Sequence, residues 1–190
     1  SLGYETSDAA AVGGTTTVGD FVVQPKGVGL KDSIINYKKE AVEGKAMVDY
    51  VLHGIIMDPT DQSFADIPSM PEVGVASVKL FMAYKGMDYY ATDDSIFKAL
   101  QIAKKCGVTI MVHAENADII DVKIKQLLAE GKTGTENFSV SRPVLCEAEA
   151  TSRAVYMAKM ANAPLFVVHV TNRTSAKVLW EARDEGVLAF

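Results

Sequence analysis

Short apolar, β-branched segments alternate with segments of helical periodicity along most of this 190-residue chain. The apolar segments predict strands over residues 15–23, 47–56, 75–84, 108–114 and 165–170. Apolar residues at helical spacing, followed by glycine or proline, predict the helices. These cover about residues 32–44, 92–107, 119–128, 147–161 and 175–185. Strands that alternate with helices form βαβ units, so the sequence predicts an α/β fold with a parallel sheet.

Five βα units fit either an open doubly wound sheet or part of a (β/α)8 barrel. No GxGxxG motif follows a predicted strand, and Gly13-Gly14 precedes one, on the wrong side to cradle a phosphate. A complete barrel needs about 250 residues. We therefore expect residues 1–190 to form a single partial TIM-barrel domain, from about strand 2 to the start of strand 7. Residues 186–190 would begin that last strand, and residues 58–72 and 131–141 would be loops.

The composition is that of an ordinary globular chain. It is 48% hydrophobic and 23% charged, with a net charge of −5, and its scattered lysines argue against a nucleic-acid surface. No apolar run approaches the ~20 residues of a membrane helix, and no charged-then-apolar leader starts the sequence. Cys106 and Cys146 are isolated, which predicts neither a disulfide framework nor a CxxC site. We therefore expect a cytoplasmic protein with neither a membrane nor a nucleic-acid partner.

One lysine interrupts an otherwise apolar strand, in the sequence SVKLFMAYKG that begins at Ser77. Alternation places one set of side chains on one face (Val75, Ser77, Lys79 and Phe81) and a second set on the other (Val78, Leu80 and Met82). A buried ammonium is costly unless it is paired or deprotonated. Considered alone, Lys79 would be a lysine that reaches solvent from a strand end.

Two of the three histidines lie at the ends of other predicted strands. His113 lies in VTIMVHAEN and His169 in PLFVVHVTN. A single strand histidine is more often a packed residue, but the C-terminal strand ends of a barrel converge on its active site. Neutral imidazoles are common zinc ligands. A lysine amine that has captured carbon dioxide is a carbamate, which can bridge two metals about 3.5–4 Å apart. Lys79, His113 and His169 are therefore candidate metal ligands.

Several motifs together resemble one enzyme family. SVKLFMAYKG, VHAEN, SRP at residues 141–143, EAEATSRA at residues 147–154 and VVHVT resemble the dihydropyrimidinase/hydantoinase branch of the cyclic amidohydrolases. GGTTTVGDFV at residues 13–22 is similar to the family's second barrel strand. The resemblance runs along nearly the whole chain, in the family's order. It implies an amidohydrolase-type (β/α)8 barrel, of which this chain covers about five to six βα units, and a small β-sandwich that this sequence lacks.

The resemblance also implies a zinc-dependent hydrolysis that opens 5,6-dihydropyrimidines and 5-substituted hydantoins, as in pyrimidine catabolism. Lys79 would be the carboxylated lysine that bridges two zinc ions, and His113 and His169 would hold the second zinc. Tyr84 would be the catalytic residue that donates a hydrogen bond to the oxyanion. The expected partners are a small cyclic amide or ureide and further copies of the chain, a homotetramer by resemblance.

Two parts of the family's site have no counterpart in this sequence. The first strand of the family supplies a His-x-His pair to the first zinc, and its last strand supplies an aspartate that is both ligand and general base. His53 is no replacement, because it lies within a predicted strand and is expected to be packed. At most one zinc would then be well ligated, and we expect the chain alone not to hydrolyse cyclic amides.

Other interpretations stay open. A scaffold of the collapsin-response mediator type typically lacks the lysine and the second histidine, which are present here as Lys79 and His169. A sister enzyme such as an allantoinase would use the same metals on another ring. Around the site, Glu115 and Asn116 either orient His113 or cap the next helix. Arg142 has no expected role beyond ion pairing.

Overall fold

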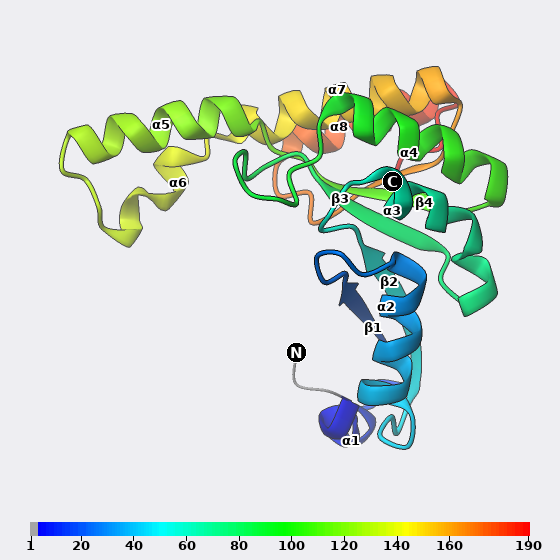
Figure 1. Ribbon diagram of the computed structural model, residues 1–190. Helices are drawn as coiled ribbons and strands as arrows, with labels where there is room; N and C mark the ends of the chain where they lie inside the picture. The colour runs from blue at the N-terminus through cyan, green and yellow to red at the C-terminus, as the bar shows by residue number, and fades with distance from the viewer. Residues whose placement is uncertain (1–3) are drawn as a thin grey trace.

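The computed structural model describes residues 4–190, which form one parallel sheet with helices packed along one side of it (Figure 1). The strands are β1 (Thr17–Val23), β2 (Asp49–Ile55), β3 (Ser77–Phe81), β4 (Thr109–His113) and β5 (Leu165–Val167). They pair in the order β1-β2-β3-β4-β5, and every pair is parallel, as predicted. Leu165 also forms a parallel bridge with Ala189, so residues 186–190 do begin to add a further strand.

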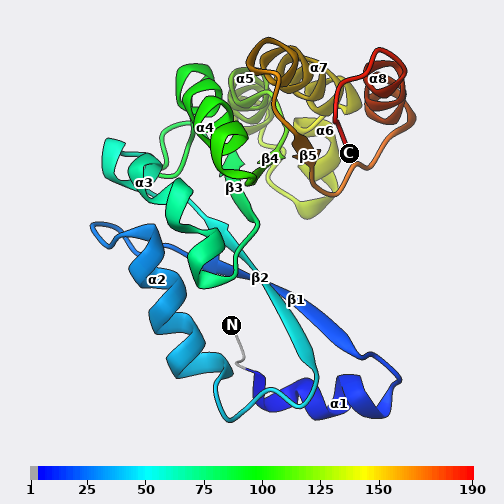
Figure 2. The same cartoon turned by 90° about the vertical axis from the view of Figure 1, so that its right-hand side faces the viewer.

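The helices that follow the strands lie side by side around the sheet (Figure 2). They are α2 (Leu30–Tyr37), α3 (Asp61–Asp66), α4 (Asp93–Cys106), α5 (Ala117–Ala129), α6 (Phe138–Ser141), α7 (Val144–Ala161) and α8 (Arg173–Asp184). A short helix, α1 (Ser7–Val12), precedes β1. Short turns of 3-10 helix cover Tyr4–Thr6, Ile67–Ser69, Pro71–Val73 and Thr135–Asn137, and a π-helical turn covers Lys38–Val42. None of the helices within residues 4–190 has the length and apolar character that a membrane crossing requires.

Both segments that we expected to be loops contain helical structure. In residues 58–72, the Thr60 side chain accepts a hydrogen bond from the Ser63 amide at 3.3 Å and caps α3. Pro68 and Pro71 then fall in the first turns of two 3-10 helices, where a missing amide hydrogen costs nothing. Residues 131–141 contain the 3-10 turn Thr135–Asn137 and α6. The polar composition of these segments concealed short helices, of which α3 alone has a side-chain cap.

Several predicted boundaries move by a few residues. The helix expected over residues 32–44 is α2 followed by the π-helical turn, and α7 begins at Val144 instead of residue 147. α7 ends at Asn162, which adopts a left-handed conformation (φ 49°), and not at Pro164. The bounds predicted for α4 are correct, since Thr92 is the residue before the helix and Gly107 ends it at φ 73°.

The two faces of the sheet differ in burial. On β3, Val78, Leu80 and Met82 are no more than 1% exposed beneath the helices. On β2, an added side chain at Gly54 would meet Leu30 at 3.3 Å, so glycine permits the close approach of α2. The opposite face of the sheet stays partly open, because Ser77, Lys79 and Phe81 are only half-buried. The predicted alternation on β3 is therefore confirmed, and Lys79 lies on the open face.

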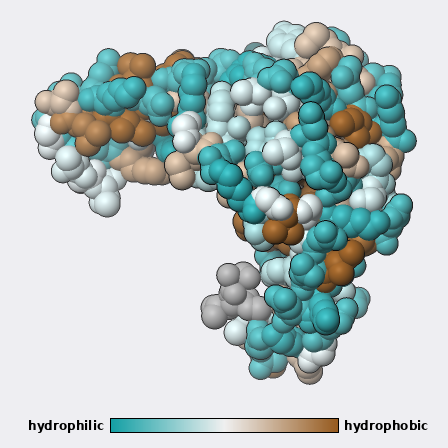
Figure 3. Space-filling view, viewed as in Figure 1, coloured by the Kyte–Doolittle hydropathy of each residue, from teal (hydrophilic) through white to brown (hydrophobic). Residues whose placement is uncertain are grey.

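The pair α5 and α6 projects from the body of the molecule (Figure 1). Exposed apolar side chains gather on this projection (Figure 3), among them Val122 at 53% and Phe138 at 66% exposure. Only Ala117 and Ile120 of α5 are buried. The projection is therefore sparsely packed.

Truncating the covered face of β3 should destabilise the fold strongly. Leu80 is fully buried, so Leu80→Ala removes packed methyl groups and leaves a cavity, at a cost of about 2–5 kcal/mol in the free energy of unfolding. Leu145→Ala, the same change at a side chain that is 69% exposed, should cost less than about 0.5 kcal/mol. Urea unfolding followed by circular dichroism measures both. Equal losses would show that the helices do not cover this face.

Candidate functional site

The strand ends bring two of the predicted residues into direct contact. His113 is the last residue of β4, and His169 lies two residues beyond β5. The Nδ1 atom of His113 lies 2.9 Å from Nε2 of His169. Parallel pairing aligns Val167 with Val112, which places the two strand ends at the same edge of the sheet. The geometry therefore unites two imidazoles that are 56 residues apart in the sequence.

Lys79 lies on the open face, next to this imidazole pair. Its Nζ atom is 4.8 Å from the ring centre of Phe21 and 4.8 Å from that of Phe81. Burial lowers the pKa of Lys79 below its usual range. The pKa of His169 is also lowered, first by burial, then by His113, with a smaller contribution from the charge of Lys79. Burial is thus the first cause of the lowered pKa at both Lys79 and His169, and it shifts each group toward its neutral form.

The tautomer of neutral His113 follows from its second contact. Its Nε2 atom lies 2.7 Å from Oε2 of Glu115. An ionised carboxylate only accepts hydrogen bonds, so Nε2 carries the proton and donates it to Glu115. The lone pair is then on Nδ1, the atom that faces His169. We infer this assignment from the hydrogen-bond network.

Glu115 and Asn116 divide the two roles that the sequence left open, which are to orient His113 and to cap the next helix. Glu115 orients His113, and its carboxylate also accepts a hydrogen bond from Nη1 of Arg142 at 2.5 Å. Asn116 caps α5, because its side-chain oxygen accepts from the Ile119 amide at 3.0 Å. Arg142 forms the ion pair that we expected, and it lies inside the candidate site.

Tyr84 lies beside the imidazoles, at the rim of the site. Its ring centre is 5.5 Å from that of His113, and the Arg142 guanidinium is 5.3 Å above its ring. Within residues 4–190, Tyr84, His169 and Asn162 are the non-glycine residues with positive φ, and Asn162 caps α7. Left-handed backbone at non-glycine residues costs energy and often marks functional sites. Here two such residues adjoin one pocket.

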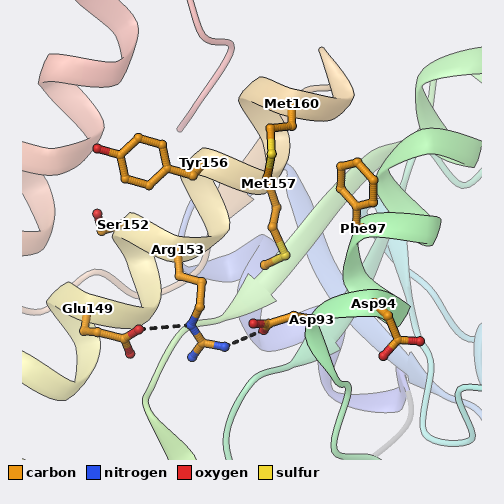
Figure 4. Close-up of a pocket in the computed structure, with 9 residues that line it drawn as sticks. All are labelled: Asp93, Asp94, Phe97, Glu149, Ser152, Arg153, Tyr156, Met157 and Met160. Carbon is orange, nitrogen blue, oxygen red and sulfur yellow. Dashed lines mark hydrogen bonds and ion pairs between the residues drawn. The ribbon is translucent and has the colours of Figure 1, made fainter.

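These side chains line a cavity of about 350 Å³, whose walls include Tyr84, His113, Glu115, Arg142, His169 and Thr171. A larger cavity of about 670 Å³ lies between α4 and α7 (Figure 4). Its charged residues are already engaged there, since Arg153 pairs with both Glu149 and Asp93. None of the predicted site residues lines that larger cavity, so the smaller cavity is the candidate functional site.

His53 is packed, as expected, and lies outside this group. Its Nδ1 atom contacts Oγ of Ser77 at 2.5 Å, and its ring packs against Phe21 with centres 4.9 Å apart. Among residues 4–190, no three His, Cys, Asp or Glu side chains are grouped so as to hold a metal ion. Within this described part of the chain, His113 and His169 are therefore a pair of candidate ligands without a third residue of these types placed to share a metal ion with them.

One residue that supports the site was missed at the level of sequence. Glu147, in the first turn of α7, accepts hydrogen bonds from the Thr171 amide at 3.0 Å and from the Thr171 hydroxyl. These contacts anchor the segment that follows His169. The acidic EAEA stretch was a visible signal, but only the fold places it beside residue 171.

The sheet, its one-sided helical cover and a site at the carboxyl ends of the strands define a partial (β/α) barrel of the amidohydrolase type. No family model matches the chain. D-hydantoinase from Ralstonia pickettii is 42% identical over 182 residues, which are 96% of this chain and 39% of the relative. Dihydropyrimidinase from Rattus norvegicus is 36% identical over 188 residues, 98% of this chain and 36% of that protein.

Solved structures agree with these relatives. A D-hydantoinase structure superposes with a TM-score of 0.92 at 40% identity, covering 99% of this chain and 41% of that one. The dihydropyrimidinase from Brevibacillus agri NCHU1002 gives 0.91 at 38% identity, with the same coverage of both chains. The chain therefore belongs to the D-hydantoinase/dihydropyrimidinase family, and it spans about two fifths of the length of these relatives. The predicted fold class and family are confirmed.

His53 provides a pH test of the open face. Burial lowers its pKa below 6.5, so the unfolded chain binds more protons than the folded chain near that pH. The free energy of unfolding should therefore decrease as pH falls through 6.5, in part because His53 becomes protonated in the unfolded chain. His53→Gln should show a smaller decrease over the same range. Urea unfolding of both proteins at pH 8 and pH 5.5 measures the difference. An identical pH dependence would contradict the burial of His53.

Proposed function

We propose that this chain is part of the catalytic barrel of a metal-dependent cyclic amidohydrolase that opens dihydropyrimidine or hydantoin rings. The names of the relatives support the class of reaction. The observation that carries the proposal is the contact between His113 and His169 in one cavity, with Lys79 on the same face of the sheet against the Phe81 ring that also neighbours His113. A small cyclic amide or ureide is the proposed substrate, and a cytoplasmic homotetramer is the proposed assembly.

The two histidines fit a zinc ion. Two nitrogen ligands at Zn–N distances of about 2.0–2.1 Å in a tetrahedral site lie about 3.3 Å apart. His113 Nδ1 and His169 Nε2 are 2.9 Å apart, so a small movement of the rings would admit the ion. Glu115 already holds the far nitrogen of His113, as carboxylates commonly do behind a zinc-bound histidine. The pair is therefore arranged as ligands.

Lys79 fits the role of a carboxylated bridging ligand. An amine must be neutral to capture carbon dioxide, and burial shifts Lys79 in that direction. The carbamate would be an anion between two aromatic rings, so a bound cation would be needed to stabilise it. A complete site would hold two zinc ions, of which the residues of this chain would ligate at most one well.

Each side chain of the pocket then has a task. Zinc bound there would lower the pKa of a water molecule and polarise the ring carbonyl. Tyr84 would donate a hydrogen bond to the oxyanion that develops on that carbonyl. His113 would stay in its Nε2–H tautomer because Glu115 accepts that proton. No carboxylate is yet assigned as the general base, so we propose that this chain by itself does not turn over substrate.

A scaffold role is the weaker candidate. The collapsin-response mediator type would not need Lys79 or His169, yet both are present here: His169 lines the pocket, and burial lowers the pKa of both side chains. A sister cyclic amidohydrolase with another ring substrate remains compatible with the same residues. We therefore propose an enzyme and leave the particular ring open.

Zinc binding should depend on both histidines. We expect about one zinc per chain of this length, and we expect His113→Ala and His169→Ala each to abolish tight binding. His53→Ala, a change on the same sheet but outside the pocket, should leave the zinc content unchanged. Dialysis against zinc followed by elemental analysis measures the content. Equal zinc in all four proteins would contradict the proposed site.

Lys79 should carry a carbamate when zinc is present. Protein supplied with zinc and ¹³C-bicarbonate should show a carbamate carbon signal in ¹³C NMR, and Lys79→Arg should remove it because arginine stays protonated. Lys85→Arg, a change at an exposed lysine paired with Asp118, is the matched control. A signal that persists in Lys79→Arg would place the carbamate elsewhere.

Tyr84 should act on the rate of ring opening. In a form of the protein long enough to hydrolyse dihydrouracil or hydantoin, Tyr84→Phe should lower kcat by about 10²–10³-fold, the usual cost of losing one oxyanion donor. Tyr89→Phe, which alters the neighbouring ring and leaves Tyr84 in place, should retain activity. The short chain should show no turnover in the same assay. An unchanged kcat in Tyr84→Phe would remove Tyr84 from the mechanism.

A further inference from the structure

Arg142 contacts three parts of the candidate site at once. It lies directly after α6 and before Pro143. Its Nη1 atom donates to Oε2 of Glu115 at 2.5 Å. Its guanidinium also lies 5.3 Å from the ring centre of Tyr84 and 5.1 Å from that of Phe138. The Arg142 side chain therefore links Glu115, which orients His113, with Tyr84 at the rim of the site.

The contact with Glu115 is shared with His113. The same oxygen, Oε2, accepts from His113 Nε2 at 2.7 Å and from Arg142 Nη1 at 2.5 Å. The side chains of Glu115 and Arg142 are only 16% and 15% exposed, so solvent screens this pair poorly. The position of the Arg142 guanidinium therefore affects where Oε2 of Glu115 lies. The orientation of the His113 ring depends on that oxygen in turn.

The donors of the Arg142 guanidinium are not all used at this position. The Nε atom of Arg142 is buried and has no hydrogen-bond partner. The position of this guanidinium is thus set by Glu115 and the two rings, not by satisfaction of all its donors.

We propose that Arg142 is a positioning residue: through Glu115 it fixes the tautomer and orientation of His113, and through its ring contact it fixes Tyr84. This role rests on the proposed function, in which His113 is a metal ligand and Tyr84 is the oxyanion donor. Arg142 would then position both of these groups. Arginine suits the position, since its planar guanidinium can bond a carboxylate and stack on an aromatic ring at the same time.

Arg153 offers a matched control. It also pairs with carboxylates, Glu149 and Asp93, and it lies in the larger cavity between α4 and α7 (Figure 4). Within residues 4–190, the hydrogen bonds of the Arg153 side chain go to Glu149 and Asp93, and none goes to His113 or Tyr84. Loss of an arginine ion pair as such should therefore affect Arg142→Gln and Arg153→Gln alike, whereas loss of positioning should affect only the first.

The test compares the metal-free and zinc-loaded protein in four forms: wild type, Arg142→Gln, Arg142→Lys and Arg153→Gln. Long-range ¹H–¹⁵N NMR at pH 8 reports the tautomer of His113, assigned by its loss in His113→Asn. Competition with a chelator reports zinc affinity. We expect wild type to hold His113 as the Nε2–H tautomer. We expect Arg142→Gln to mix the tautomers, shift the Tyr84 ring signals and weaken zinc binding about 10–100-fold.

Arg142→Lys should recover the charge but not the stacking, so we expect the His113 tautomer to be partly restored and the Tyr84 signals to stay shifted. Arg153→Gln should match wild type in every readout. If Arg142→Gln keeps the wild-type tautomer, or if Arg153→Gln loses it equally, the positioning role is wrong. If Arg142→Gln does not fold, the Arg142→Lys protein decides the question. NMR signals of both His113 and Tyr84 that match wild type in Arg142→Lys would then contradict the positioning role. If wild type binds no zinc, the proposed function fails, while the metal-free tautomer still decides the role of Arg142.

Discussion

The parallel pairing of β3 with β4 is the constraint on which the site depends. Its register aligns Phe81 with His113 and Lys79 with Met111. Because side chains alternate between faces, a slip of one residue would move Lys79 beneath the helices and expose Leu80. The buried Val78 and Leu80 oppose such a slip, since both are fully covered in the observed register. The apolar packing of one face thus fixes the chemistry of the other.

The open face gives Lys79 and the histidines their unusual properties. Half-buried between two aromatic rings, Lys79 has lost much of its hydration, and burial lowers its pKa. The same cause comes first in lowering the pKa of His169. A lowered pKa makes the neutral form of each group easier to reach, and the neutral form is the one that can act as a ligand or capture carbon dioxide. The position of these side chains, more than their identity, makes them candidates for function.

Local sequence patterns sufficed for the strand order and the alternation on β3, and they singled out Lys79, His113 and His169 as candidate ligands. They failed where the decisive contact is distant or is a cap. The helix in residues 58–72 begins at a cap formed by Thr60, and residues 131–141 contain only short helical turns, so polar composition hides both. Glu115 and Asn116 are neighbours with different tasks, and only the fold separates them. Arg142 lies 27 residues from Glu115, a pairing that no periodicity reports.

Anomalous scattering at the zinc edge, from crystals of the protein grown with zinc, tests the central claim most directly. A zinc ion should lie within bonding distance of His113 Nδ1 and His169 Nε2, with Lys79 directed toward it and Glu115 still holding His113 Nε2. A peak located elsewhere, such as at the cavity between α4 and α7, or no peak at the imidazole pair at saturating zinc, would contradict the assignment of these strand ends as a metal site.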